Sequence, residues 1–134
     1  MDFPDINYLA VLVSALAFFV LGSLWYSPVL FSRAWMKELG LTKESIAGGN
    51  MFKTFGLSFL LMLIMAFNLA AFIGNGQGFQ FGMTAGALTG IGWVALAIGI
   101  NYLFERKSFM IWLINAGYMA IGFTIMGAII GAWQ

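Results

Sequence analysis

The chain has 134 residues, of which 62% are hydrophobic and 8% are charged. A soluble domain carries roughly 45–50% apolar and about 25% charged residues, so this chain has too few charges to cover a surface in water. The net charge of +1 argues against a nucleic-acid partner. Because the chain contains neither Cys nor His, we expect no metal and no cofactor. The length predicts one domain, residues 1–134.

Four segments without Lys, Arg, Asp or Glu are long enough to cross a bilayer. They cover about residues 6–26, 55–73, 81–104 and 109–133. A helix crosses a ~30 Å hydrocarbon core in about 20 residues. A β-barrel would need alternating apolar and polar residues, and residues 57–66 do not alternate. The sequence therefore predicts an all-α protein with four transmembrane helices.

The basic residues predict how these helices are oriented. All six Lys and Arg residues fall in the first and third connections, residues 27–54 and 105–108. Basic loops stay on the cytoplasmic side of a membrane. We therefore expect a multi-pass protein with both of these loops in the cytoplasm and with both termini outside. The acidic start of the chain and the lack of a cleavage site predict that the first segment is retained.

The first span ends in an aromatic pair, Trp25 and Tyr26, which Pro28 follows. Proline fixes its own backbone and restricts the residue before it, so the chain bends here. Beyond the bend, apolar and basic side chains fall on different helical faces, which predicts an amphipathic helix over about residues 28–39. This helix would lie in the cytoplasmic interface, against anionic lipid. Its interfacial anchors are Phe31, Arg33, Trp35 and Lys37.

Amide and aromatic side chains gather near the cytoplasmic ends of the spans. An amide in lipid must find a hydrogen-bond partner. Asn101 and Asn115 lie on helices that a short turn joins, so they could meet across this hairpin. One interpretation is a set of interhelical bonds, and the other is a cleft for a small ligand. The candidate cleft residues are Trp25, Tyr26, Asn101, Tyr102, Asn115 and Tyr118.

Small residues recur every three or four positions in the last two spans. Such stripes let helix backbones approach closely. They indicate either packing of the third span on the fourth or an interface between subunits, and we expect a homo-oligomer. Trp93, near the middle of the third span, is expected to fill space that neighbouring glycines leave. The stripe residues are Gly82, Gly86, Gly90, Ala120, Thr124, Gly127 and Gly131.

One stretch resembles a known family. Residues 21–28 read Leu-Gly-x-x-Trp-Tyr-Ser-Pro, and Asn7, Phe31, Trp35, Met36 and Gly40 extend the pattern. The pattern resembles small bacterial four-helix membrane proteins that are catalogued as domain-of-unknown-function family 1761. The resemblance implies a protein of the bacterial inner membrane, and it implies no activity, cofactor or catalytic residue.

The functional classes are limited by where the charges lie. The predicted spans contain no ionisable carboxylate, Lys or Arg, on which proton relays and charged-substrate transport usually depend. The five acidic residues form no spaced motif for acid–base chemistry, so we expect no enzyme. One hypothesis is binding or passage of a small neutral or amphipathic molecule, through an oligomer or a cytoplasm-facing cleft. The other is a structural or accessory membrane protein that binds lipid or a partner protein.

Overall fold

The computed structural model describes residues 5–47 and 50–133. In this part of the chain the regular elements are all helices: α1 (Tyr8–Trp25), α2 (Ser32–Leu39), α3 (Lys43–Ala47), α4 (Met51–Ile73), α5 (Gly78–Thr89), the π-helix η1 (Gly90–Val94), α6 (Ala95–Phe104) and α7 (Phe109–Ala132). Four helices are long and apolar enough to cross a membrane: α1, α4, the continuous Gly78–Phe104 and α7. The predicted all-α fold with four spans is confirmed. The second span starts earlier than predicted because the Asn50 side chain caps α4, accepting a hydrogen bond from the Lys53 N–H at 3.1 Å.

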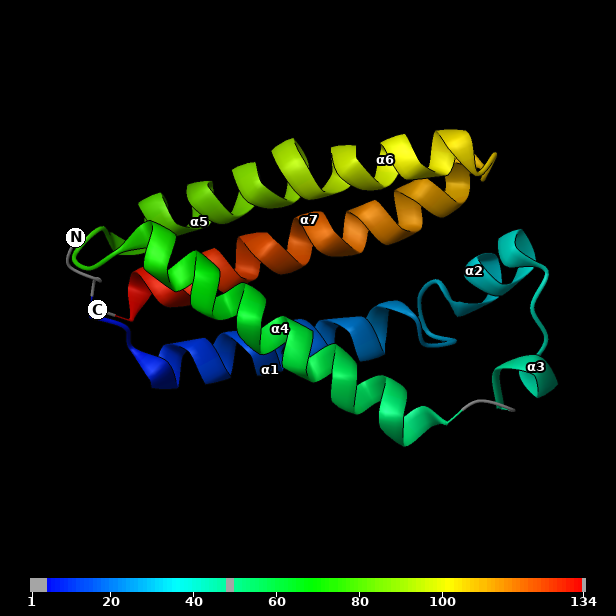
Figure 1. Cartoon of the computed structure of the whole chain (residues 1–134), viewed down its shortest axis with the longest axis horizontal. Helices are drawn as coiled ribbons and strands as arrows, with labels where there is room; N and C mark the ends of the chain where they lie inside the picture. Colours follow the sequence, from blue (N-terminus) through cyan, green and yellow to red (C-terminus); the bar gives the residue numbers. More distant parts are fainter. Residues whose placement is uncertain (1–4, 48–49, 134) are drawn as a thin grey trace.

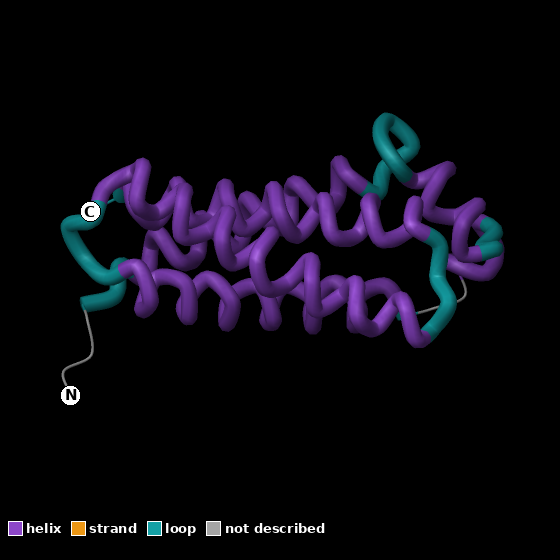
Figure 2. Tube along the Cα trace, turned by 90° about the horizontal axis from the view of Figure 1, so that it is seen from above, coloured by secondary structure: helices purple, strands orange, loops and turns teal. Residues whose placement is uncertain are grey.

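The last span, α7, lies at the centre of the arrangement. It contacts α5, η1 and α6 on one side and α1 on the other, whereas α4 packs mainly on α1, which it crosses in Figure 1. The spanning helices follow the long axis of the molecule, and the loops lie near its two ends (Figure 2). The core forms where α1, α4, α5 and α7 meet, and Phe18 and Met126 are among its fully buried side chains.

The small-residue stripes bring α5 and α7 into contact within one chain. A Cβ atom added to Gly82 would overlap the Gly127 carbonyl oxygen, and one added to Gly86 would overlap the Phe123 carbonyl oxygen. A Cβ atom on Gly90 would lie 2.9 Å from the Ala120 Cα atom, and one on Gly131 would also overlap α5 backbone. Backbone touches backbone here, which is the close approach that small residues permit. Of the two interpretations, packing within the chain accounts for these glycines.

A π-helix interrupts the third span. The Ala95 N–H donates to the Gly90 carbonyl, five residues back, where an α-helix bonds four back. The positions that face α7 therefore move one residue further along the chain beyond this turn. Ala95 is buried against α7, and Trp93 is 78% exposed. The prediction that Trp93 fills an internal gap is wrong, because η1 turns its side chain away from the bundle.

The exit from the first span is a turn followed by a short helix. The Phe31 N–H donates to the Trp25 carbonyl at 3.0 Å, and the Ser27 hydroxyl donates to the Leu24 carbonyl at 2.7 Å. These bonds close a turn over residues 27–31, so α2 begins at Ser32 and is shorter than the predicted helix. It ends at Leu39, as predicted, and its cap residue Gly40 has a φ of +68°, which favours glycine.

Candidate functional site

One end of the molecule carries all the basic residues. Figure 1 shows that α2, α3, the start of α4 and the turn between α6 and α7 lie at the same end, opposite the described ends of the chain. We call this the basic end. Its Lys and Arg residues are Arg33, Lys37, Lys43, Lys53, Arg106 and Lys107.

A chain of three polar side chains joins the helices at this end. The Tyr26 hydroxyl donates to Asn115 Oδ1 at 2.5 Å, and Asn115 Nδ2 donates to the Tyr102 hydroxyl at 2.7 Å. Tyr26 follows α1, Tyr102 belongs to α6 and Asn115 belongs to α7. Both ends of the half-buried amide are therefore bonded inside the protein.

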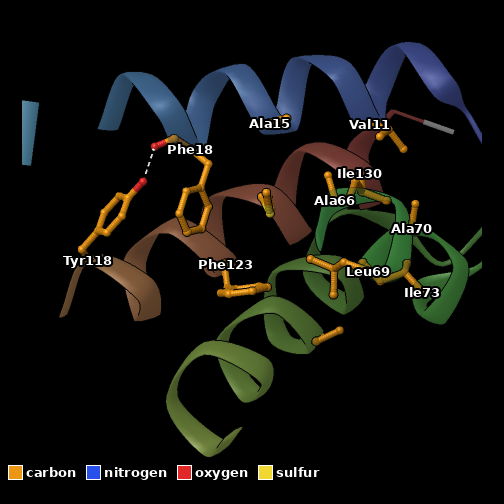
Figure 3. Packing of buried hydrophobic residues seen from close by; sticks show 12 residues of the cluster. Val11, Ala15, Phe18, Ala66, Leu69, Ala70, Ile73, Tyr118, Phe123 and Ile130 are labelled. Carbon is orange, nitrogen blue, oxygen red and sulfur yellow. Dashed lines mark hydrogen bonds between the residues drawn. The ribbon is translucent and has the colours of Figure 1, made fainter. Parts of the chain in front are cut away.

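The other aromatic donors are bonded to backbone carbonyls. The buried Tyr118 hydroxyl donates to the Phe18 carbonyl at 2.9 Å (Figure 3), and it fills the space beside Gly22. The Trp25 indole donates to the Ile114 carbonyl at 2.8 Å. These bonds fix α1 to α7 and use the polar hydrogens of both side chains. Together with Tyr26, Tyr102 and Asn115, these residues form one cluster.

Asn101 lies outside this cluster. Its side chain is exposed, and it makes no hydrogen bond to the residues that the structure describes. Asn115 bonds to Tyr102, the next residue, and one residue corresponds to about 100° of rotation around a helix. The contact between Asn101 and Asn115 that the short turn would allow therefore does not occur.

The predicted interfacial anchors divide into two groups. The Phe31 ring lies 4.7 Å from the Trp25 ring and the Trp35 ring lies 5.6 Å from the Tyr26 ring, as centroid distances. These half-buried aromatic rings hold the start of α2 against the bundle. Arg33 and Lys37 are the exposed members of the set.

The end of α2 is also tied to the turn between α6 and α7. The Ser108 hydroxyl donates to Glu38 Oε2 at 2.6 Å, and its oxygen accepts from the Ile111 N–H at 3.1 Å as the N-cap of α7. One serine thus caps a helix and joins two elements that are far apart in sequence.

The turn itself has a defined geometry. The Lys107 N–H donates to the Tyr102 carbonyl at 3.0 Å and the Arg106 N–H donates to the Leu103 carbonyl at 3.3 Å, the two bonds of a Schellman motif. Arg106 has φ = +58°, a conformation that usually belongs to glycine. The motif directs Lys107 back along α6, so its Nζ lies 5.6 Å from the centre of the Tyr102 ring.

A groove of about 280 Å³ opens on the outer side of this hairpin. Its walls are mainly apolar and include Leu103, Phe109 and Trp112, and Lys107 and Ser108 lie at one end. The Trp112 indole donates to the Ala95 carbonyl at 2.9 Å, so this side chain is fixed across the groove. Nothing in the sequence marks this groove, because Trp112 resembles a membrane-interface anchor and Lys107 resembles an ordinary turn residue. The spacing between Gly99 and Trp112 gives no visible signal.

A second groove, of about 380 Å³, is lined by α5, η1 and one residue of α7. Leu88, Ile91, Gly92 and Thr124 are among its lining residues, and none of the residues that line it is charged. Thr124, a member of the predicted stripe, donates to the Ala120 carbonyl at 2.7 Å in its own helix. This groove has the character of a surface that faces lipid.

The fold and the site define a multi-pass helical membrane protein with an amphipathic helix fixed against its basic end. The chain belongs to the family described as protein of unknown function (DUF1761), whose model matches residues 9–131. This match agrees with the resemblance noted at residues 21–40. No curated protein and no solved structure matches the chain.

Proposed function

We propose that this protein is a non-catalytic binding protein of the bacterial inner membrane, with its basic end in the cytoplasm and its termini outside. In this proposal it holds a small amphipathic molecule in the groove between α6 and α7. The observation that carries the proposal is the groove itself: apolar walls meet the cationic Lys107 at one end. An apolar pocket with a few polar groups at its edge is the usual form of a ligand site.

Binding is better supported than passage. A molecule that crosses the bundle must exchange hydrogen bonds with the groups along its path. Here Tyr26, Asn115 and Tyr102 bond to one another, and Trp25 and Tyr118 bond to backbone carbonyls. Opening this cluster would leave polar groups without partners in an apolar surrounding, which is unfavourable. The groove shares Tyr102 with the cluster and opens at the surface, so a ligand reaches it without breaking these bonds.

A photoactivatable monoacylglycerol tests this proposal, because it is a neutral amphipathic molecule. We expect illumination in detergent to label residues 103–112, and we expect excess unlabelled monoacylglycerol to reduce this labelling. The second groove, around Leu88 and Ile91, serves as the internal control, since it is apolar but uncharged. Equal labelling of both grooves, unaffected by the competitor, would contradict the proposal.

A second candidate is an accessory role in which α2 binds a partner protein. The observation that favours it is the pair of exposed basic residues, Arg33 and Lys37, on a helix that Glu38 ties to Ser108. Crosslinking in membranes from Arg33 to a partner protein, lost in Arg33→Glu with Lys37→Glu, would support this role. Crosslinks to lipid alone would contradict it.

The homo-oligomer stays a prediction, and it now requires a face other than the glycines. Gly82, Gly86 and Gly127 are already in contact within the chain. Light scattering on the purified protein in detergent, corrected for bound detergent, measures the oligomeric state directly. A monomeric mass at all concentrations would contradict the prediction.

A further inference from the structure

The groove between α6 and α7 combines apolar walls with a cationic end, which complement the acyl chains and the anionic headgroup of a phospholipid. Leu103, Phe109 and Trp112 form apolar walls, and Lys107 lies at the end nearest the turn. Its volume of about 280 Å³ is just below that of ligand sites, which measure ~300–1,000 Å³. A groove of this size accepts part of one flexible chain.

The two cations of the turn beside this groove, of which Lys107 lines it and Arg106 precedes Lys107 in the chain, lack carboxylate partners. In the part of the chain that the structure describes, neither Arg106 nor Lys107 has a carboxylate within ion-pair distance. The nearby acidic residues are Glu105, in the same turn, and Glu38, which accepts the Ser108 hydroxyl bond. The Lys107 ammonium instead lies 5.6 Å from the Tyr102 ring centre, which places it beside the groove.

The backbone conformation of Arg106 indicates that the charge of its side chain has a function. Arg106 occupies the left-handed position of a Schellman motif, where glycine is the unstrained residue. An arginine is therefore less favourable than glycine for the fold at this position, and its charge is the property that glycine lacks. The same motif fixes the direction of Lys107.

We propose that this groove binds one anionic phospholipid, with the phosphate at Arg106 and Lys107 and one acyl chain along Leu103, Phe109 and Trp112. The inference rests on the proposed function and narrows its amphipathic ligand to one class. Basic pockets at the cytoplasmic ends of transmembrane helices are suited to anionic headgroups, and the membrane supplies such a ligand directly. A free phosphate would leave the apolar walls unoccupied.

Native mass spectrometry with matched variants tests this inference. The protein is purified in detergent that contains equal amounts of phosphatidylglycerol and phosphatidylcholine, and the lipid retained on each molecule is measured. We expect the wild type to retain phosphatidylglycerol in preference. We expect Lys107→Gln to lower this retention roughly fivefold, as for the loss of one cation near an anionic surface. Lys53→Gln, an equal charge change at an exposed residue of α4, should leave phosphatidylglycerol retention unchanged.

Arg106→Gly provides a second variant, in which a loss of lipid retention cannot be explained by loss of the fold. It removes one charge and relieves the left-handed conformation. We expect a higher melting temperature together with lower phosphatidylglycerol retention. Unchanged retention in both Arg106→Gly and Lys107→Gln would overturn the inference, and so would an equal fall in Lys53→Gln.

Two further outcomes separate the inference from the proposed function. Equal retention of both lipids, with specific monoacylglycerol labelling of residues 103–112, would overturn the anionic ligand and leave the proposed function standing. Loss of both results would overturn both. Release of the bound lipid by inorganic phosphate, at constant ionic strength, would identify a phosphate site and overturn the lipid assignment.

Discussion

The third span contacts α7 in two different ways along its length. In the half away from the basic end, glycine backbone touches glycine backbone, as at Gly82 and Gly127. In the half toward the basic end, side chains bridge the helices, as in the bonds from Trp112 to Ala95 and from Asn115 to Tyr102. Helices in lipid gain little from the hydrophobic effect between them, so each half depends on direct contact.

The two halves carry grooves of different chemistry. Backbone contact fixes the distance between α5 and α7, and the groove beside it, lined by α5, η1 and Thr124, is uncharged. Side-chain bonds hold α6 and α7 further apart, and the space beside Gly99 and Trp112 opens to the surface. The groove beside the glycine half therefore has only uncharged walls, whereas the groove beside the polar half has Lys107 at one end.

The largest effect is expected from breaking the glycine half. Gly86→Ala places a methyl group against the Phe123 carbonyl oxygen. The atoms that it meets are backbone atoms, which cannot rotate away as a side chain can, so it should destabilise the fold by about 3 kcal/mol. Gly92→Ala is the matched control, because nothing lies within 4 Å of its added methyl group. Thermal unfolding in detergent should show a large fall for the first variant and no fall for the second. Equal melting temperatures would contradict the backbone contact.

A smaller effect is expected from breaking the polar half. Asn115→Leu removes both bonds of the amide and leaves the Tyr26 and Tyr102 hydroxyls without it. Membrane-protein hydrogen bonds are worth about 0.6–1.7 kcal/mol each, so we expect a loss of about 1–3 kcal/mol in unfolding free energy. Asn101→Leu is the control, because its side chain is exposed. A similar loss in both variants would show that Asn115 has no special role.

The link between α2 and the hairpin should contribute less. Ser108→Ala removes the N-cap of α7 and the bond to Glu38, so we expect a loss of about 1 kcal/mol. Its control is Ser23→Ala, since Ser23 bonds only to the Phe19 carbonyl in its own helix. The measurement is again unfolding free energy, and limited proteolysis of α2 should quicken in Ser108→Ala alone. Equal proteolysis rates would argue against the link.

The smallest change, and one of opposite sign, is expected at Ser14. Its hydroxyl is fully buried, and it has no hydrogen-bond partner among the described residues. Ser14→Ala removes an unsatisfied polar group and leaves a small apolar one, so the fold should gain up to about 1 kcal/mol. A clear loss of stability would show that the hydroxyl has a hydrogen-bond partner, such as a buried water, and that this bond stabilises the core.

The architecture could be predicted from the sequence because a helix that crosses lipid must be long and nearly free of charge. The absence of charge over four long segments is enough to predict the spans, and Gly40 marks the end of α2 by its need for a positive φ. The stripe spacing predicted close helix contact but left open which helix would supply it. Only the structure pairs Gly82 with Gly127 in one chain.

The site was predicted less well, for a reason that lies in the helix itself. Counting along an unbroken α-helix turns Asn101 toward Asn115. The extra residue in η1 turns Tyr102 there instead. The groove was missed because Trp112 and Lys107 are ordinary residues for a membrane interface and a turn. Their use depends on a Schellman motif and a bond to Ala95, which residue types alone do not show.

The π-helix also has a consequence for how the chain can vary in length. Because η1 takes up one extra residue in a single wide turn, a family member that lacks one residue between positions 90 and 94 would have an unbroken α-helix there. The residues on either side would still point toward α7. Gly92, whose added side chain would touch nothing, is the residue most easily lost. A single-codon deletion is therefore tolerable at this point of the third span, whereas the same change among the glycines of α5 would move them off α7.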